Sequence, residues 1–129
     1  MAGKIKHLSL GQVADIHDKI IDEFGNAKGI LDEANLQFAL SRAEKYSGRE
    51  DVLFWKTAII LELIVKGHPF VDGNKRTGFE SCKTFLDMNH YMLEAPDDEI
   101  INFLLNVAKN KLNRHEIKKW LKLHARKQI

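Results

Sequence analysis

The pattern of apolar and polar positions is helical along nearly the whole chain. In residues 9–25 the apolar positions share one face of a helix and the acidic residues fall away from it; the apolar set is Leu10, Val13, Ile16, Ile20 and Phe24. Ser9 and Gln12 have the spacing of a capping box, and Gly25 is a natural C-terminal stop. A second helix is predicted from the N-cap candidate Asp32 to near Gly48.

The next two predicted helices form the centre of the fold. Apolar residues cover most of the circumference of residues 51–66, and a helix that is apolar nearly all round packs on several sides. Gly67 is expected to end this helix. A fourth helix is predicted over residues 74–88, and the side chains that it turns inward are Phe79, Cys82, Phe85 and Leu86.

The last third of the chain adds two helices and one extended piece. Residues 91–95, "YMLEA", read as a short extended segment, and helical patterns follow over residues 97–110 and 113–127, each with an Asp or Asn cap. Asn113 and Glu116 have capping-box spacing. Strand signals are otherwise almost absent. The expected fold is an all-α bundle of about six helices with a possible short hairpin edge.

Composition narrows the class of protein further. The chain has 129 residues, so residues 1–129 are expected to form one domain. Its net charge of +2 argues against a nucleic-acid binder driven by phosphate neutralisation, and the basic stretch over residues 118–129 is interpreted as a solvated helix face. Cys82 is the only cysteine and is interpreted as a small buried residue. With no signal peptide and no membrane-spanning run, we expect a cytoplasmic protein.

The segment "KGHPFVDGNKRTGF", residues 66–79, gathers polar groups where two predicted core helices meet. Pro69 disfavours helical geometry at His68, so the chain must turn there. Phe70 is the expected apolar anchor of the turn. The remaining polar residues crowd at the start of the next helix; they are His68, Asp72, Gly73, Asn74, Lys75 and Arg76.

These residue types suit the handling of phosphate. A helix N-terminus offers unpaired N–H groups and the positive end of the dipole, Gly73 permits close backbone approach, and Lys75 and Arg76 add charge. Asp72 is compatible with this cradle if it holds Mg²⁺, and His68 can accept a proton from an attacking hydroxyl. The site predicted is one for phosphoryl or nucleotidyl transfer.

Each residue also has a purely structural interpretation. His68 can be a structural hydrogen-bonding side chain before a helix, and Asp72 can be an N-cap. Lys75 and Arg76 can be solvated surface charges. What favours the functional interpretation is that all of these residues occur together in one compact loop, and that no other catalytic or metal-binding motif competes elsewhere in the chain.

The stretch "HPFVDGNKR", residues 68–76, resembles the signature of the Fic/Doc superfamily, which is roughly H-x-F-x-[D/E/A]-[G/A]-N-[G/K]-R. Other stretches, including "LSLGQVADIHDKIIDEFG" and "FLDMNHYMLEA", are similar to its Doc (death-on-curing) branch, so the resemblance covers nearly the whole chain. It implies a Fic-like helical domain and a toxin of a toxin–antitoxin pair that uses ATP and Mg²⁺.

The resemblance also implies a role for each motif residue. His68 would be the catalytic base and Asp72 would place Mg²⁺ on the nucleotide phosphates. Gly73 and Asn74 would supply the anion hole, with Lys75 beside it. Arg76 would stabilise charge on the phosphates, and Phe70 would lock the loop. The implied reaction is phosphorylation of a hydroxyl on a translation factor, with elongation factor Tu the target by analogy.

Two departures from the adenylylating Fic pattern G-N-G-R-x-x-R bear on which group is transferred. Lys75 replaces the middle glycine and Phe79 replaces the second arginine, and Doc-type kinases have the same lysine. These departures favour phosphorylation over AMP transfer, which stays the alternative; a non-catalytic helical binding module is a third hypothesis. The self-inhibiting motif [S/T]-x-x-x-E-[G/N] is not found. Restraint is therefore expected from an antitoxin protein in trans.

Overall fold

The computed structural model describes residues 4–24 and 29–128, and it confirms the all-α fold. Within these residues the chain forms six helices and two short strands; in order they are α1 (Leu10–Phe24), α2 (Glu33–Lys45), α3 (Val52–Gly67), α4 (Asn74–Met88), β1 (Tyr91–Leu93), α5 (Asp97–Ala108), α6 (Arg114–Leu123) and β2 (Ala125–Lys127). The expected stop at Gly25 lies outside the described residues.

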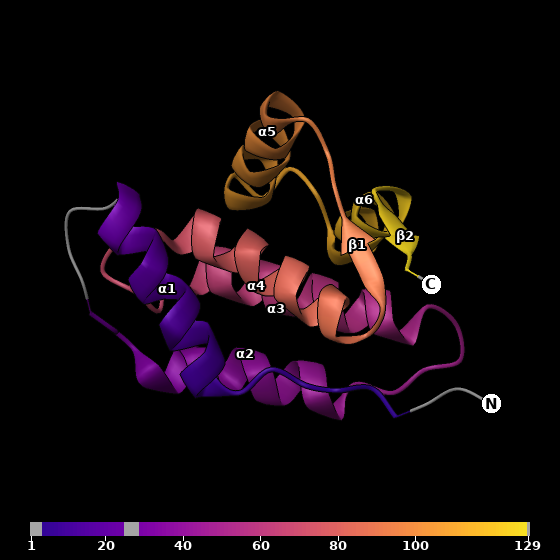
Figure 1. The fold of residues 1–129 in the computed structure, drawn as a ribbon, viewed down its shortest axis with the longest axis horizontal. Helices are drawn as coiled ribbons and strands as arrows, with labels where there is room; N and C mark the ends of the chain where they lie inside the picture. Colours follow the sequence, from indigo (N-terminus) through magenta and orange to yellow (C-terminus); the bar gives the residue numbers. More distant parts are fainter. Residues whose placement is uncertain (1–3, 25–28, 129) are drawn as a thin grey trace.

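Helix α3 is the centre of the molecule, as its apolar circumference predicts. It packs against α2, α4, α5 and α6, and Figure 1 shows α3 and α4 running together through the middle of the fold. The close approach of these two helices depends on Gly78 of α4, where an added Cβ would lie 3.1 Å from Val65 Cγ2. The four side chains predicted to point inward from α4, from Phe79 to Leu86, are all buried.

Three of the predicted helix starts are capped as expected. The Ser9–Gln12 capping box forms with bonds of 2.8 and 3.1 Å, and Asp32 Oδ1 accepts a hydrogen bond from the amide of Asn35. Asn113 and Glu116 cap α6 reciprocally. The predicted Asp cap of α5 is wrong.

Pro96 is instead the N-cap residue of α5, and no side chain caps this helix. The acidic residues Asp97, Asp98 and Glu99 lie inside its first turn. In that position their charge still favours the positive end of the helix dipole, which explains why the acidic cluster marks the start of the helix without supplying the cap.

The extended piece forms one strand of a two-stranded antiparallel sheet. Tyr91 pairs with Lys127 and Leu93 pairs with Ala125. The prediction that the last helix continues to residue 127 is therefore wrong, since α6 ends at Leu123. The C-terminal residues exchange backbone hydrogen bonds with a strand more than thirty positions earlier, and no local pattern in the sequence encodes that partner.

Charged side chains fasten α6 to α3. Lys118 and Lys122 both contact the Asp51 carboxylate, at 3.2 and 2.8 Å, and these hydrogen bonds, chiefly that from Lys122, hold the pKa of Asp51 below its usual range. Arg114 pairs with Glu62 at 2.7 Å. Part of the basic C-terminal stretch is thus engaged in intramolecular ion pairs and does not form a uniform cationic face.

The prediction that Cys82 is a small buried residue is confirmed. Cys82 is fully buried, and burial raises the pKa of its thiol, in agreement with a packing role. Among the described helices, none combines the length and the apolar content needed to cross a bilayer.

Candidate active site

The loop between α3 and α4 begins at His68, which is the C-cap residue of α3. Its backbone is left-handed, with φ 47° and ψ 56°, and its N–H donates to the carbonyl of Ile64. As predicted, α3 ends at Gly67, and the chain leaves the helix at His68 because Pro69 disfavours right-handed helical geometry at the residue before it. A left-handed conformation is uncommon outside glycine, and here it places an exposed imidazole beside the start of α4.

Phe70 anchors the loop as predicted, since it is only 1% exposed. The side chain of Asn74 holds it from the first turn of α4: Phe70 N–H donates to Asn74 Oδ1 and Asn74 Nδ2 donates to the Phe70 carbonyl, both at 3.0 Å. The same Nδ2 lies 3.4 Å from His68 Nδ1, which is a long contact. The amide of Asn74 is therefore used to shape the loop, and an anion hole at this residue would rest on its backbone N–H.

A short segment before α2 fastens the loop from its other side. The N–H groups of Leu31 and Asp32 both donate to the carbonyl of Pro69, at 2.7 and 2.9 Å, and Val71 N–H donates to the carbonyl of Gly29. Ile30 and Phe70 form an isolated antiparallel bridge. The loop is thus held by backbone pairing as well as by its buried aromatic residue, a feature that helical periodicity does not reveal.

Asp72 and Gly73 form the entrance to α4. Asp72 Oδ1 accepts a hydrogen bond of 2.8 Å from the N–H of Gly73, whose φ of 77° is one that side chains rarely adopt. An added Cβ on Gly73 would lie 3.3 Å from Ile21 Cδ1 and 3.9 Å from His17 Cδ2. We expected position 73 to be glycine because a side chain would block an anion. The geometry shows two other reasons: the backbone is left-handed there, and α1 packs closely against it.

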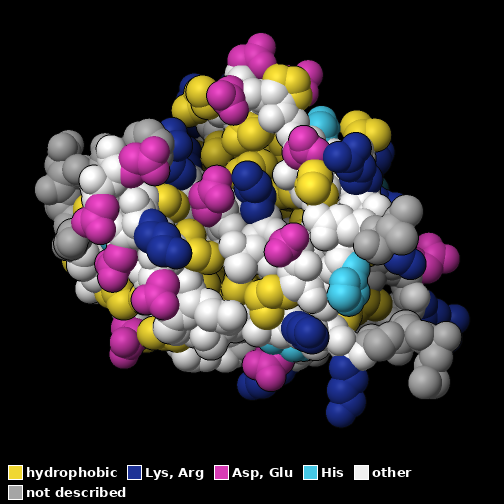
Figure 2. All heavy atoms as spheres, viewed as in Figure 1, with side chains coloured by type: hydrophobic (Ala, Val, Ile, Leu, Met, Phe, Trp, Pro, Cys, Tyr) yellow, Lys and Arg dark blue, Asp and Glu magenta, His cyan; other side chains and the backbone are white. Residues whose placement is uncertain are grey.

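Lys75 and Arg76 are exposed in the first turn of α4, at the mouth of a pocket of about 530 Å³. The α4 side of the pocket is mostly polar. Its α5 wall begins at Asp97 and is otherwise apolar; the apolar residues are Ile100, Ile101, Leu104 and Leu105. Figure 2 shows the hollow between α5 and α4, with apolar side chains below α5 and charged side chains around them. A ligand whose anionic group binds at the start of α4 could therefore place an apolar ring against α5.

The sequence profile of the Fic/DOC family matches residues 7–86, which include α1 to α3, the whole loop and all but the last two residues of α4. This chain belongs to the Fic/DOC family. It is 30% identical over 87 residues to the protein kinase doc of Escherichia phage P1, a match that covers 66% of this chain and 69% of that protein. It is 33% identical over 78 residues to the toxin Doc of Mycolicibacterium smegmatis, covering 58% of this chain and 60% of that protein.

These similarities confirm the Doc branch that the motif indicates. The structure brings the predicted site residues together in one loop and in the first turn of α4, where the sequence predicts them; they are His68, Asp72, Gly73, Asn74, Lys75 and Arg76. Their individual roles remain predictions. The α5 wall of the pocket lies beyond the residues that match the family profile.

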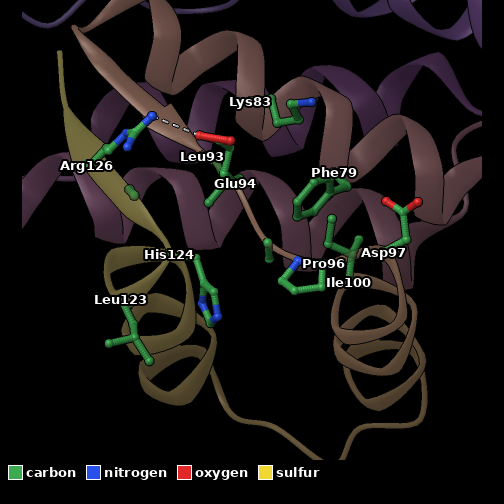
Figure 3. Close-up of a pocket in the computed structure, with 12 residues that line it drawn as sticks. Phe79, Lys83, Leu93, Glu94, Pro96, Asp97, Ile100, Leu123, His124 and Arg126 are labelled. Atoms are coloured by element: carbon green, nitrogen blue, oxygen red, sulfur yellow. Dashed lines mark hydrogen bonds and ion pairs between the residues drawn. The ribbon is translucent and has the colours of Figure 1, made fainter.

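A second cleft of about 680 Å³ adjoins this Fic/DOC site on the side of the two-stranded sheet (Figure 3). Both spaces are lined by Phe79, Lys83, Asp97 and Ile100. An ion pair of 3.2 Å between Arg126 of β2 and Glu94 lies at the sheet side of the cleft. Phe79 is 4% exposed and packs edge-on against Trp120, so the residue that replaces the second arginine of adenylylating relatives is part of the core.

His17 is a residue of the site that sequence reasoning missed. It lies on α1, is 1% exposed, and reaches the motif loop through its ring and its Nε2 atom. A signal was present, because His17 is four residues after Val13 and three before Ile20 and so falls on the buried face of the predicted helix. A histidine on an apolar face indicates a buried polar partner, but the sequence does not say which.

Proposed function

We propose that this protein is a Mg²⁺-dependent kinase of the Doc type, which transfers the γ-phosphoryl group of ATP to a hydroxyl side chain of a target protein. The observation that carries the proposal is the placement of an exposed imidazole, His68, beside a helix N-terminus that bears Lys75 and Arg76 and opens into a pocket. The similarity to the protein kinase doc supports phosphoryl transfer as the reaction.

The proposed reaction needs one proton transfer and one displacement. His68 takes the proton of the target hydroxyl, the hydroxyl oxygen forms a bond to the γ-phosphorus, and the bond between that phosphorus and the β,γ-bridging oxygen breaks, so that ADP leaves. Backbone N–H groups at the start of α4, with Lys75 and Arg76, stabilise the charge on the phosphate oxygens. The base and the phosphates of the nucleotide would both lie at the N-terminal end of α4.

Asp72 is the residue of the loop that fits a metal. Among the described residues no three metal-ligating side chains converge, so a cation here would be shared between the Asp72 carboxylate and the nucleotide phosphates. That arrangement is the usual one for Mg²⁺, which is bound through one or two carboxylates plus substrate phosphates. Mg²⁺ would neutralise charge that develops on the phosphate oxygens during transfer.

We expect Asp72→Asn to raise the Mg²⁺ concentration required for transfer, because an amide oxygen can still coordinate a hard cation but lacks the charge that holds it. The measurement is the transfer rate as a function of Mg²⁺ for wild type and variant. Asp98→Asn on α5 is a matched control, since Asp98 is exposed and outside the pocket. Equal metal dependence in all three proteins would reduce Asp72 to its hydrogen bond with Gly73.

The proposed target and partner follow from the Doc branch. The substrate would be a translation factor in the cytoplasm, with elongation factor Tu the first candidate by analogy. An antitoxin protein would restrain the enzyme in trans, because the self-inhibiting motif of the family is not found in this chain. The relative named toxin Doc supports membership of a toxin–antitoxin pair.

The proposed reaction is tested with two labelled nucleotides. Purified protein, Mg²⁺ and purified elongation factor Tu are incubated with ATP labelled at the γ-phosphate or at the α-phosphate, and the mass added to the target is read by mass spectrometry. Label from the γ-phosphate alone is the expected result. Label from the α-phosphate would establish AMP transfer, and absence of both would reject this target.

Lys75 is predicted to decide which phosphate faces His68. It occupies space that a glycine leaves open at the anion hole, so the nucleotide should bind with its γ-phosphorus within about 3–3.5 Å of the attacking oxygen. Lys75→Gly is expected to weaken γ-transfer and to permit some AMP transfer, measured as product mass. Lys75→Ala is the matched control, because it removes the charge and keeps a Cβ. Lys83→Gly is not suitable, because a glycine in the interior of α4 would destabilise the helix itself.

A double variant with Lys75→Gly and Phe79→Arg would restore both residues of the adenylylating pattern, but it is not a clean test. It would bury a guanidinium group at a position that is 4% exposed and packed on Trp120. The single variants at position 75 therefore decide the question. Wild type that attaches AMP, or variants that transfer γ-phosphate at the wild-type rate, would contradict the prediction.

A further inference from the structure

We infer that His17 of α1 is a positioning residue for the motif loop: its Nε2–H holds the backbone at Asp72, and its ring supports Phe70. The inference rests on the proposed function for its catalytic consequence, but its structural content is independent of that function. His17 is far from the motif in sequence, and its only link to the reaction is the loop that it contacts.

The hydrogen bond is the first of two contacts. His17 Nε2 lies 2.8 Å from the carbonyl oxygen of Asp72. A carbonyl oxygen can only accept, so the proton of the ring must be on Nε2. Asp72 is the residue directly before Gly73, where the chain turns into α4 through a left-handed conformation. A donor at this carbonyl orients the peptide plane between Asp72 and Gly73, and with it the Gly73 N–H.

The ring stack is the second contact. The imidazole of His17 and the ring of Phe70 are parallel to within 9°, and their centroids are 3.8 Å apart. Phe70 is itself held by the side chain of Asn74. His17 therefore touches the loop at two residues on either side of Val71, so it resists both sliding and rotation of the segment that carries Asp72.

The rest of the α1 face closes the same end of α4. Ile20 and Ile21 are buried, and they lie within van der Waals distance of the position where a Cβ on Gly73 would stand. Helix α1 is thus packed directly against the entrance to α4. His17 is the one residue of this face whose side chain offers a polar group to the loop, because the other buried positions of α1 in the described part are apolar.

Position of the loop matters because transfer depends on geometry. A displacement of about 1 Å in a reacting group can cost about 10²-fold in rate. The carboxylate of Asp72 and the imidazole of His68 are four residues apart on this loop, so a rotation at Asp72 changes the distance between the proposed metal ligand and the proposed base. His17 sets that distance from outside the motif.

Two substitutions separate the two contacts. His17→Phe keeps an aromatic ring against Phe70 and removes the donor to the Asp72 carbonyl. His17→Gln removes the ring and keeps an Nε2–H donor at the same number of bonds from Cα. His7→Phe is a matched control: His7 is a half-buried imidazole whose ring centroid lies 6.1 Å from that of Phe85, but its Nε2 has no partner among the described residues.

The expected kinetic result is a split between the variants. His17→Phe should lower kcat by about 10- to 100-fold, with a smaller change in KM for ATP and a melting temperature close to wild type. His17→Gln should lower the melting temperature and restore most of kcat, and His7→Phe should leave kcat unchanged. A His17→Phe protein with wild-type kcat, or a His17→Gln protein as slow as His17→Phe, would overturn the inference.

A readout without turnover keeps the inference separate from the proposed function. Amide hydrogen exchange at Gly73 and Asn74, followed by NMR in the protein without nucleotide, should be faster in His17→Phe than in wild type and near wild type in His17→Gln. Unchanged exchange in His17→Phe would overturn the inference. If wild type transfers no phosphate, the proposed function fails while the exchange comparison still decides the role of His17. If His17→Phe does not fold, His17→Gln decides the inference by itself. A kcat and an amide exchange rate near wild type in His17→Gln would support the inference, and a large loss of kcat with faster exchange would overturn it.

Discussion

His68→Ala is expected to fold and to lose phosphoryl transfer by about 10²- to 10⁴-fold, which is the usual contribution of a general base. The side chain is exposed, so little packing is lost. The substitution can still strain the backbone, because position 68 has a φ of 47° and alanine adopts this left-handed conformation less readily than histidine. His68→Asn is therefore the matched variant: asparagine adopts left-handed geometry readily and cannot act as the base.

The measurement is the single-turnover rate at which each variant phosphorylates the target, together with the melting temperature of each variant. Both variants should be slow, and His68→Asn should melt close to wild type. If either variant keeps wild-type turnover, His68 is not the base and the mechanism proposed above is wrong. A slow His68→Ala beside a fast His68→Asn would show that backbone strain, not proton transfer, was lost.

Phe70→Ala is expected to destabilise the protein more than any other single substitution in the loop. Removing a buried aromatic side chain costs about 3–5 kcal/mol, and Phe70 is among the largest fully buried side chains of the described chain. Its neighbour Val71 is 52% exposed, so Val71→Ala is a control that alters the same loop without opening a cavity.

Urea denaturation followed by circular dichroism measures both variants. The unfolding midpoint of Phe70→Ala should fall clearly, and that of Val71→Ala should stay near wild type. An unchanged midpoint for Phe70→Ala would show that the backbone pairing of Pro69 and Val71 with residues 29–32 is sufficient to hold the loop. A loss of stability with an intact loop would appear as a lower midpoint and normal kcat in the folded protein.

Much of the architecture was predictable because it is encoded locally. A helix is specified by the spacing of apolar residues and by the residues at its ends, and both are readable in one dimension. The capping pairs Ser9–Gln12 and Asn113–Glu116 form as predicted, and the helix over residues 52–67 is central because it is apolar on nearly all sides. The errors lie at helix ends: Pro96 and not an Asp is the N-cap residue of α5, and α6 ends at Leu123, before the predicted end at residue 127.

The features that were missed depend on partners distant in sequence. The strand at Ala125–Lys127 exists because β1 lies beside it, and Leu31 and Asp32 are held by the carbonyl of Pro69. Neither pairing leaves a trace in the periodicity of its own segment, since every residue has a backbone carbonyl that accepts and every residue except proline has an N–H that donates.

The candidate site divides in the same way. By itself the sequence determined the composition of the loop and the family, because His68, Phe70 and Asp72 to Arg76 all lie within residues 68–76 and their spacing is the signature. The tertiary structure alone decided how the loop is held: it directs the amide of Asn74 to Phe70, turns Gly73 against α1, and brings His17 to the carbonyl of Asp72. The physical reason is that residue type is local, whereas the position of a backbone peptide is set by whichever distant side chains pack against it.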